Sequence, residues 1–164
     1  MTKPLGAFLR RTGALGNHGS YFECVSISTP IKGRIVAVFN DLELEYLRSQ
    51  PLMRFASASL SGRPDVATVA FTVEGDEIVT AGSDIAKTVR YKNIHANPQA
   101  TVVIDDLASV QPWSPRGVKV RGRASIDRGP GGERFRIRPE VIWSWGINSP
   151  GPGIPEMERR TVES

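Results

Sequence analysis

The stretch GVKVRGRASI, residues 117–126, alternates small or apolar residues with cations. One parity holds Val118, Val120 and Gly122, and the other holds Lys119, Arg121 and Arg123. Because successive side chains of a strand point to opposite faces, this pattern predicts a β-strand with one buried face. Small antiparallel barrels bury alternate side chains in this way.

The segments on either side add more strands than helices. LMRFASASL and DVATVAFTV flank SGRP, which is a turn signal, so residues 52–73 are predicted to form a hairpin. Asn40 or Asp41 can cap a helix that Pro51 stops. Further strands are predicted at 77–82, 100–106 and 135–147, a second helix at about 84–94, and loops at 107–116 and 128–134. Short strands with only two short helices indicate an antiparallel barrel or sheet.

The length of 164 residues predicts one domain. Residues 1–34 show no sustained period and are predicted to be an irregular extension that folding and ligand binding do not need. The ordered domain is expected over 35–148, and residues 149–164 are predicted to be a flexible tail. Cys24 is the single cysteine and no run approaches about 18 apolar residues, which predicts a cytoplasmic protein without a membrane span.

The formal charge of +4 is unevenly distributed. Between residues 116 and 138, only Asp127 and Glu133 oppose eight cations. These are Arg116, Lys119, Arg121, Arg123, Arg128, Arg134, Arg136 and Arg138. Such a zone favours an anionic partner, or it is a solvated strand face.

The second predicted helix carries cations at the end where its macrodipole is already positive. Lys87 and Arg90, three residues apart, are neighbours on its surface and repel each other. A bound anion reverses both unfavourable terms, and Thr88 could add a hydroxyl. The alternative is an ordinary basic surface helix. Its core face is expected to be the stripe Ala86, Val89, Asn93 and Ala96.

Several segments together resemble the pyridoxamine 5'-phosphate oxidase-like split-barrel flavoproteins, in the branch of deazaflavin (coenzyme F-420)-dependent reductases. The resemblance runs from about Val38 to Ile147, and its most specific parts are DDLASVQPWSPRG and IRPEVIWSWG. It implies a mainly β (α+β) domain over 35–148, built as an antiparallel six-stranded split β-barrel that binds FMN or a related cofactor, with short flanking helices.

The resemblance also implies site residues. Counting back from Asn97-Pro98, the family's phosphate-binding run falls on Thr88, Val89 and Arg90, where Val89 departs from the pattern and Lys87 or Lys92 could replace it. The strand holding Thr80 and Ala81 would lie along the cofactor ring, and Thr68 would face it. Two subunits normally share each site, so a homodimer is expected, with Trp113, Arg116 and Trp145 as closing residues; Trp143 is expected to pack in the core.

The implied function is an F-420-dependent oxidoreductase that transfers a hydride to a small conjugated acceptor. Alternatives are an FMN-dependent pyridoxamine phosphate oxidase-like enzyme and a non-catalytic flavin- or haem-binding protein. The sequence shows no nucleophile elbow, metal-ligand cluster or nucleotide phosphate loop, and its basic strands lack the interleaved aromatic residues of nucleic-acid binders. Asp105 and Asp106 would point to opposite strand faces and serve structurally, pairing with Arg116 or another cation. The catalytic residues, the proton donor and the substrate are not specified.

Overall fold

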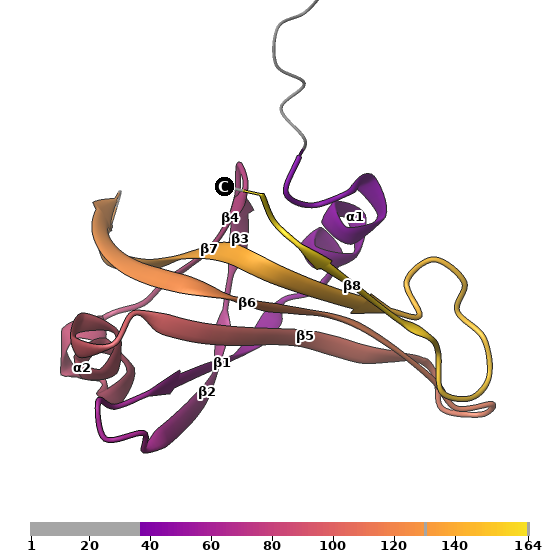
Figure 1. The fold of residues 1–164 in the computed structure, drawn as a ribbon, viewed down its shortest axis with the longest axis horizontal. Coiled ribbons are helices and arrows are strands. Elements are labelled where there is room, and N and C mark those ends of the chain that lie inside the picture. Colours follow the sequence, from indigo (N-terminus) through magenta and orange to yellow (C-terminus); the bar gives the residue numbers. More distant parts are fainter. Residues whose placement is uncertain (1–36, 130, 164) are drawn as a thin grey trace, which may run out of the picture. The chain divides into compact units, whose positions relative to one another are not determined.

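The computed structural model describes residues 37–129 and 131–163, so the predicted extension over 1–34 lies outside the described residues. The elements in chain order are α1 (Asp41–Ser49), β1 (Leu52–Ala58), β2 (Pro64–Ala70), β3 (Thr72–Glu74), β4 (Glu77–Ala81), the 3₁₀ turn η1 (Ile85–Lys87), α2 (Val89–Ala96), β5 (Gln99–Ser109), β6 (Ser114–Gly129), β7 (Gly132–Trp145) and β8 (Met157–Thr161) (Figure 1). None of the described helices has the length and apolar character needed to cross a membrane.

Helix α1 begins as predicted at Asn40, whose side chain accepts a hydrogen bond from the Glu43 N–H while the Glu43 carboxylate accepts one from the Asn40 N–H. This reciprocal capping box satisfies two backbone donors that a helix start leaves unpaired. Gln50 ends the helix in extended conformation just before Pro51. The helix turns Glu43, Tyr46 and Leu47 into the interior.

The sheet is antiparallel and follows the order β2-β1-β5-β6-β7-β4-β3, with β8 paired to β7 beside this path. This is the predicted split-barrel class, but the sheet has eight strands instead of six and does not close. One added strand is β3, which Phe71 separates from β2. The loop predicted over 107–116 is instead a tight hairpin, because β5 continues to Ser109 and β6 starts at Ser114.

The two ends of the sheet meet at a seam without pairing as strands. β2 and β3 are the terminal strands of the path, and only Phe71 lies between them in the chain. Beside Phe71, the hydroxyl of Thr80 on β4 donates a 2.7 Å hydrogen bond to the Ala70 carbonyl at the end of β2. The sheet therefore curls until its first and last strands lie next to each other, and it stays split there.

The core fills the inner face of this curled sheet. Phe55 of β1 and Phe135 of β7 meet edge to face with ring centroids 5.5 Å apart, and both are fully buried. The alternation predicted for β6 is confirmed: Val118, Val120 and Gly122 are buried and the cations between them lie outward. Gly122 sits at a register shift, where a Cβ would collide with the Arg138 carbonyl oxygen, so only glycine fits.

The C-terminal segment is not a flexible tail throughout, and that prediction is corrected here. Residues Met157–Thr161 form β8, which pairs with β7 from Val141 to Trp145. Arg160 of β8 also forms an ion pair with the buried Glu43 of α1. The sequence MERRT has no apolar alternation, because β8 lies at the edge of the sheet, and it therefore gave no strand signal.

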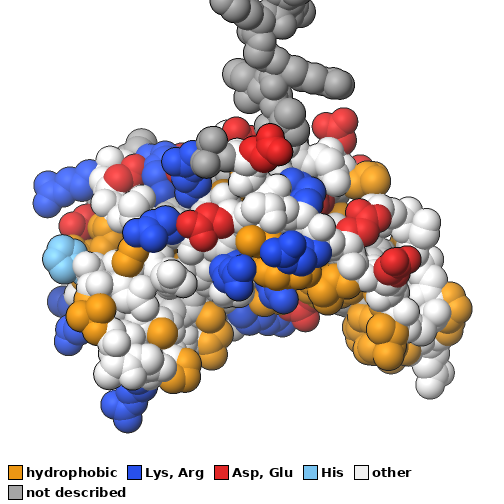
Figure 2. All heavy atoms as spheres, viewed as in Figure 1, with side chains coloured by type: hydrophobic (Ala, Val, Ile, Leu, Met, Phe, Trp, Pro, Cys, Tyr) orange, Lys and Arg blue, Asp and Glu red, His pale blue; other side chains and the backbone are white. Residues whose placement is uncertain are grey.

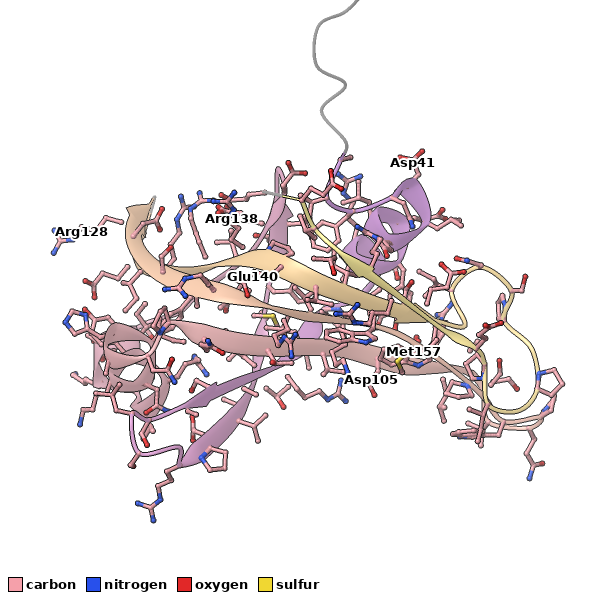
Figure 3. The ribbon with its side chains drawn as sticks, viewed as in Figure 1. Asp41, Asp105, Arg128, Arg138, Glu140 and Met157 are labelled. Atoms are coloured by element: carbon pink, nitrogen blue, oxygen red, sulfur yellow. The ribbon has the colours of Figure 1, made fainter. Side chains whose placement is uncertain are left out.

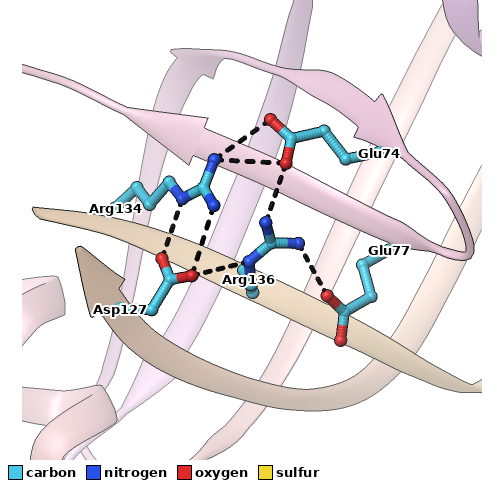
Figure 4. Close-up of polar contacts among 5 residues, drawn as sticks. All are labelled: Glu74, Glu77, Asp127, Arg134 and Arg136. Atoms are coloured by element: carbon cyan, nitrogen blue, oxygen red, sulfur yellow. Dashed lines mark hydrogen bonds and ion pairs between the residues drawn. The ribbon is translucent and has the colours of Figure 1, made fainter. Parts of the chain in front are cut away.

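The ion pairs of the basic zone show that part of it is neutralised. Arg134 and Arg136 share Asp127 and reach across to Glu74 and Glu77 on β3 and β4, at distances of 2.8–3.1 Å (Figure 4). Two hydrogen-bonding arginines hold the pKa of Asp127 below its usual value. The zone has more acidic partners than the sequence order indicated, because two of them come from distant strands.

Candidate cofactor site

The predicted helix over 84–94 is in fact two pieces. Residues Ile85–Lys87 form the turn η1, Thr88 is extended, and α2 then begins at Val89. Lys87 is exposed and pairs with Asp84 at 3.0 Å, so it is not the surface neighbour of Arg90 on one continuous helix. The prediction of two repelling cations on one helix is therefore wrong: of Lys87 and Arg90, only Arg90 lies in α2.

Thr88 caps α2, which explains the break. Its hydroxyl oxygen accepts a hydrogen bond from the Tyr91 N–H at 3.1 Å and its proton is donated to the Ile85 carbonyl at 2.7 Å. The backbone N–H groups of Val89 and Arg90 have no partner within the helix, as at any helix start. An anion beside this turn would therefore accept hydrogen bonds from these backbone N–H groups, since the Thr88 hydroxyl already donates its proton to Ile85.

Arg90 is the unusual residue of α2. It is 8% exposed, and its guanidinium carbon lies 5.2 Å from the Phe55 ring centroid and 5.3 Å from that of Phe135. Its Nε is buried with no hydrogen-bond partner among the described residues. Burial lowers the pKa of Arg90, which the charge of Asp65 partly offsets. A buried guanidinium with an unused donor is costly unless it binds something.

The core face of α2 differs from the predicted stripe. Arg90, Asn93 and Ile94 are buried, whereas Val89 is 58% exposed. The Asn93 amide donates to the Ser57 hydroxyl of β1 at 3.1 Å, which fixes the helix on the sheet. The expectation that Val89 faces the core was wrong: the stripe assumed one helix from residue 84, whereas α2 begins at Val89 after the extended cap residue Thr88.

A hollow of about 300 Å³ opens at the seam of the sheet. Thr80 and Ala81 line it from β4, and Ala70 and Phe71 line it from the end of β2. Strand β3 pairs with β4 only as far as Val79, so within the described residues no strand covers that edge of Thr80 and Ala81. The ion pair of Glu74 with Arg134 lines the hollow as well. The hollow therefore offers an open backbone edge between apolar and charged walls.

Arg90 and the hollow belong to one region of the molecule. Thr80 is the direct cross-strand partner of Phe135, whose ring contacts the Arg90 guanidinium. Thr68 lies exposed on β2, two residues before Ala70, and Lys92 is exposed on α2. Seven of the ten sequence-predicted site residues therefore lie on β2, on β4 and in the segment 85–92.

The other three predicted residues form a separate group. Trp113 is 49% exposed at the tip of the β5–β6 hairpin, at the opposite end of these long strands from α2 (Figure 1). Trp145 of β7 covers Gly117, where a Cβ would overlap the indole. One chain does not bring this group to Arg90.

Arg116 has a structural partner at that end. It donates two hydrogen bonds, of 2.7 and 2.9 Å, to the Asp106 carboxylate, as the sequence predicted for this pair. The Tyr46 hydroxyl donates to the same carboxylate at 3.0 Å. The pKa of Tyr46 is raised mainly by burial and, to a smaller extent, by the negative charge of Asp106. Asp105 pairs separately with Arg54 at 2.8 Å. The two aspartates are structural, as predicted.

The Asp106 cluster predicts a pH dependence of stability. Hydrogen bonds from Arg116 lower the pKa of Asp106 in the folded protein. A depressed folded-state pKa stabilises at pH values above the unfolded pKa of about 3.9, and this stabilisation is lost as the pH falls through the folded-state value. We expect the melting temperature of wild type to exceed that of Asp106→Asn between pH 5 and 7 and the gap to shrink below about pH 4. A gap that stays constant from pH 7 to pH 2.5 would contradict this assignment.

Trp143 is not in the core, which corrects its predicted role. It is half-buried on the outer face of β7, opposite Lys119 and Arg159.

His95 is exposed near the end of α2 and stacks on Tyr91. In the part of the chain that the structure describes, no group of three or more metal-ligating side chains gathers.

The fold and the seam define an open split barrel, and comparison with known proteins identifies its family. Residues 40–146 match the pyridoxamine 5'-phosphate oxidase family, and the chain belongs to it. It is 29% identical over 119 residues to the 5a,11a-dehydrotetracycline/5a,11a-dehydrooxytetracycline reductase of Streptomyces rimosus, covering 66% of this chain and 84% of that one.

Solved structures share the fold at lower identity. A haem-binding protein from Mycobacterium smegmatis is 17% identical, with a TM-score of 0.58 over 75% of this chain and 58% of the other. An FAD-binding protein from the same organism is 18% identical, with a TM-score of 0.51 over 63% and 92%. At these identities the similarity establishes a common fold.

Proposed function

We propose that this protein is a deazaflavin-dependent reductase, which uses reduced coenzyme F-420 to reduce a small conjugated organic acceptor. The observation that carries the proposal is the buried, unpartnered Arg90 beside an open strand edge, in a chain 29% identical to a reductase. That relative is named for tetracyclines with an additional double bond at positions 5a and 11a, so its reaction adds two electrons and two protons to a carbon–carbon bond.

The residues of the seam fit such a cofactor. Arg90 would donate its unused Nε–H to the cofactor's phosphate, together with the N–H groups at the start of α2. Thr80 and Ala81 would present their open backbone edge to the ring system, and Phe71 and Ala70 would exclude water from it. Lys87 and Lys92 would add long-range attraction from the surface.

Bound in its reduced form, F-420 would supply a hydride to the acceptor carbon. The protein's own contribution would be to hold the acceptor carbon about 3–3.5 Å from the hydride donor and to keep water out. This fits a site built from backbone, apolar side chains, the buried Arg90 and the ion pair of Glu74 with Arg134, without an activated nucleophile.

The choice of F-420 over FMN rests on its longer anionic chain, a phosphodiester followed by an oligoglutamate. Ion pairs occupy Arg116, Arg134 and Arg136, and leave Lys119, Arg121, Arg123, Arg128 and Arg138 of the basic zone without a carboxylate partner among the described residues. This remaining charge still exceeds what one phosphate requires.

We also propose that two copies of the chain share each site. Trp113 and Trp145 lie far from Arg90 in one chain, so a second subunit would have to bring them, with Arg116, to the cofactor. The exposed side chains Leu107, Val110, Trp113, Ile154 and Met157 near that end are apolar surface that such an interface would cover.

Fluorescence titration tests the cofactor assignment. We expect purified protein to bind F-420 at least about tenfold more tightly than FMN, because more anionic groups meet unpaired cations. Reduced F-420 should then turn over with enones, quinones or dehydrotetracyclines, followed by its absorbance. Equal or reversed affinities would replace F-420 with FMN, and binding of haem or flavin without turnover would make the protein a carrier.

A further inference from the structure

The outer face of the sheet carries a cluster of cations that does not line the hollow at the seam. Lys119, Trp143 and Arg159 lie directly opposite one another on β6, β7 and β8. The Lys119 ammonium is 4.0 Å from the Trp143 ring centroid, and the guanidinium carbons of Arg121 and Arg159 are 5.6 and 5.7 Å from it. Three cations therefore surround one half-buried indole.

Two more cations extend this cluster along the strands. Arg123 follows Arg121 on the same face of β6 and stands directly opposite Arg138 on β7. Arg123 and Arg138 line a hollow of about 380 Å³, and among the described residues that line it Glu140 contributes the one carboxylate. Figure 2 shows Lys and Arg side chains on the face of the molecule that it presents, and Figure 3 labels Arg138 and Glu140.

These five cations, here called the outer cation cluster, are Lys119, Arg121, Arg123, Arg138 and Arg159. Within residues 37–129 and 131–163, none of these five lies within ion-pair distance of a carboxylate. By contrast, Arg134 and Arg136 of β7 are both ion-paired. Arg123 and Arg138 are direct cross-strand partners, and like charges in such a pair are destabilising. Successive cations on β6 are roughly 7 Å apart, which is within the Debye length of about 8 Å, so salt screens their repulsion only partly.

The spacing selects the kind of anion. Lys119, Arg121 and Arg123 alternate along β6, which places them roughly 7 Å apart. Cation–π contacts with the Trp143 ring favour positions of Lys119, Arg121 and Arg159 close to one another. A single carboxylate or phosphate would meet one or two of them, whereas a chain of anionic groups would meet all.

We propose that the outer cation cluster is a binding site for a multivalent organic anion, a chain bearing several carboxylates or phosphates. The site is distinct from the seam at Thr80 and Arg90. Two sources share this chemistry: the oligoglutamate of the cofactor itself, which rests on the proposed function, and a separate polyanion.

Calorimetric titration with hexaglutamate, compared with glutamate monomer, tests the site. We expect wild type to bind hexaglutamate measurably and the monomer not, and Lys119→Gln/Arg121→Gln to weaken hexaglutamate binding about tenfold or more. Arg128→Gln is the matched control, because it removes an exposed cation from β6 away from Trp143, and it should change affinity less than twofold. Equal weakening by Arg128→Gln, or no preference for hexaglutamate, would overturn the proposal.

Two further measurements identify which anion occupies the site and keep this test independent of the cofactor assignment. If Lys119→Gln/Arg121→Gln weakens binding of F-420 but not of its tail-free chromophore, the cofactor's tail occupies the site. If it weakens only hexaglutamate, the occupant is a separate anion. Arg90→Met should leave hexaglutamate affinity unchanged, so hexaglutamate binding by a protein that ignores F-420 would refute the proposed function and support this site.

Discussion

Replacing Arg90 with methionine should weaken cofactor binding about 10- to 100-fold while making the protein more stable. The loss follows from removing a charged donor, since each hydrogen bond to a charged group contributes about 1.5–3 kcal/mol. The gain follows from the unpartnered Nε and the apolar surroundings of Phe55 and Phe135. Exchanging buried charge for an apolar side chain of similar size is often stabilising, here by an expected ~1 kcal/mol. Fluorescence titration and urea unfolding measure the two effects.

Two variants make this prediction specific. Lys92→Met removes an exposed cation from the same helix, and it should change cofactor affinity less than threefold because an exposed charge acts through screened attraction. Arg90→Lys keeps the charge but loses the planar fork, and it should lie between wild type and Arg90→Met. If Arg90→Met is less stable and binds the cofactor as wild type does, Arg90 is a packing residue and the proposed site is wrong.

The sequence predicted burial in a strand better than burial in a helix. Alternation in 117–126 predicted the buried face of β6 correctly, because burial alone decides that pattern. The position of Arg90 was not readable, since burying an arginine against two phenylalanines contradicts ordinary helix patterning. Its burial becomes understandable only when Phe55 and Phe135 are seen to meet beneath α2.

Trp143 and the acidic partners of the basic zone were missed for a related reason. Residues opposite each other on neighbouring strands share a face, so Trp143 lies outward because Lys119 does. That inference needs the strand register, which one sequence does not provide. Glu74 and Glu77 are about sixty residues from the arginines they pair with, and only the fold brings them together.

Replacing Arg160 with alanine should destabilise the protein by about 2–3 kcal/mol, on the order of 10 °C in melting temperature. The Glu43 carboxylate is 1% exposed and its ion-pair partner in the described structure is Arg160, so the variant leaves a buried charge uncompensated. Arg160 is itself 37% exposed, so water replaces part of what is lost and the expected cost lies below that of a fully buried pair. Urea unfolding monitored by tryptophan fluorescence measures it.

Neighbouring variants separate this ion pair from a general effect of β8. Arg159→Ala changes the adjacent exposed residue on the other face of β8 and should cost less than about 0.5 kcal/mol. Adding Glu43→Gln to Arg160→Ala removes the stranded charge while keeping an acceptor for the Asn40 N–H, so it should restore part of the lost stability. A double variant no more stable than Arg160→Ala would show that the charge of Glu43 is not the cause.

Deleting residues 157–164 should lower the free energy of unfolding at least as much as Arg160→Ala, because it removes both the ion pair and the strand pairing with β7.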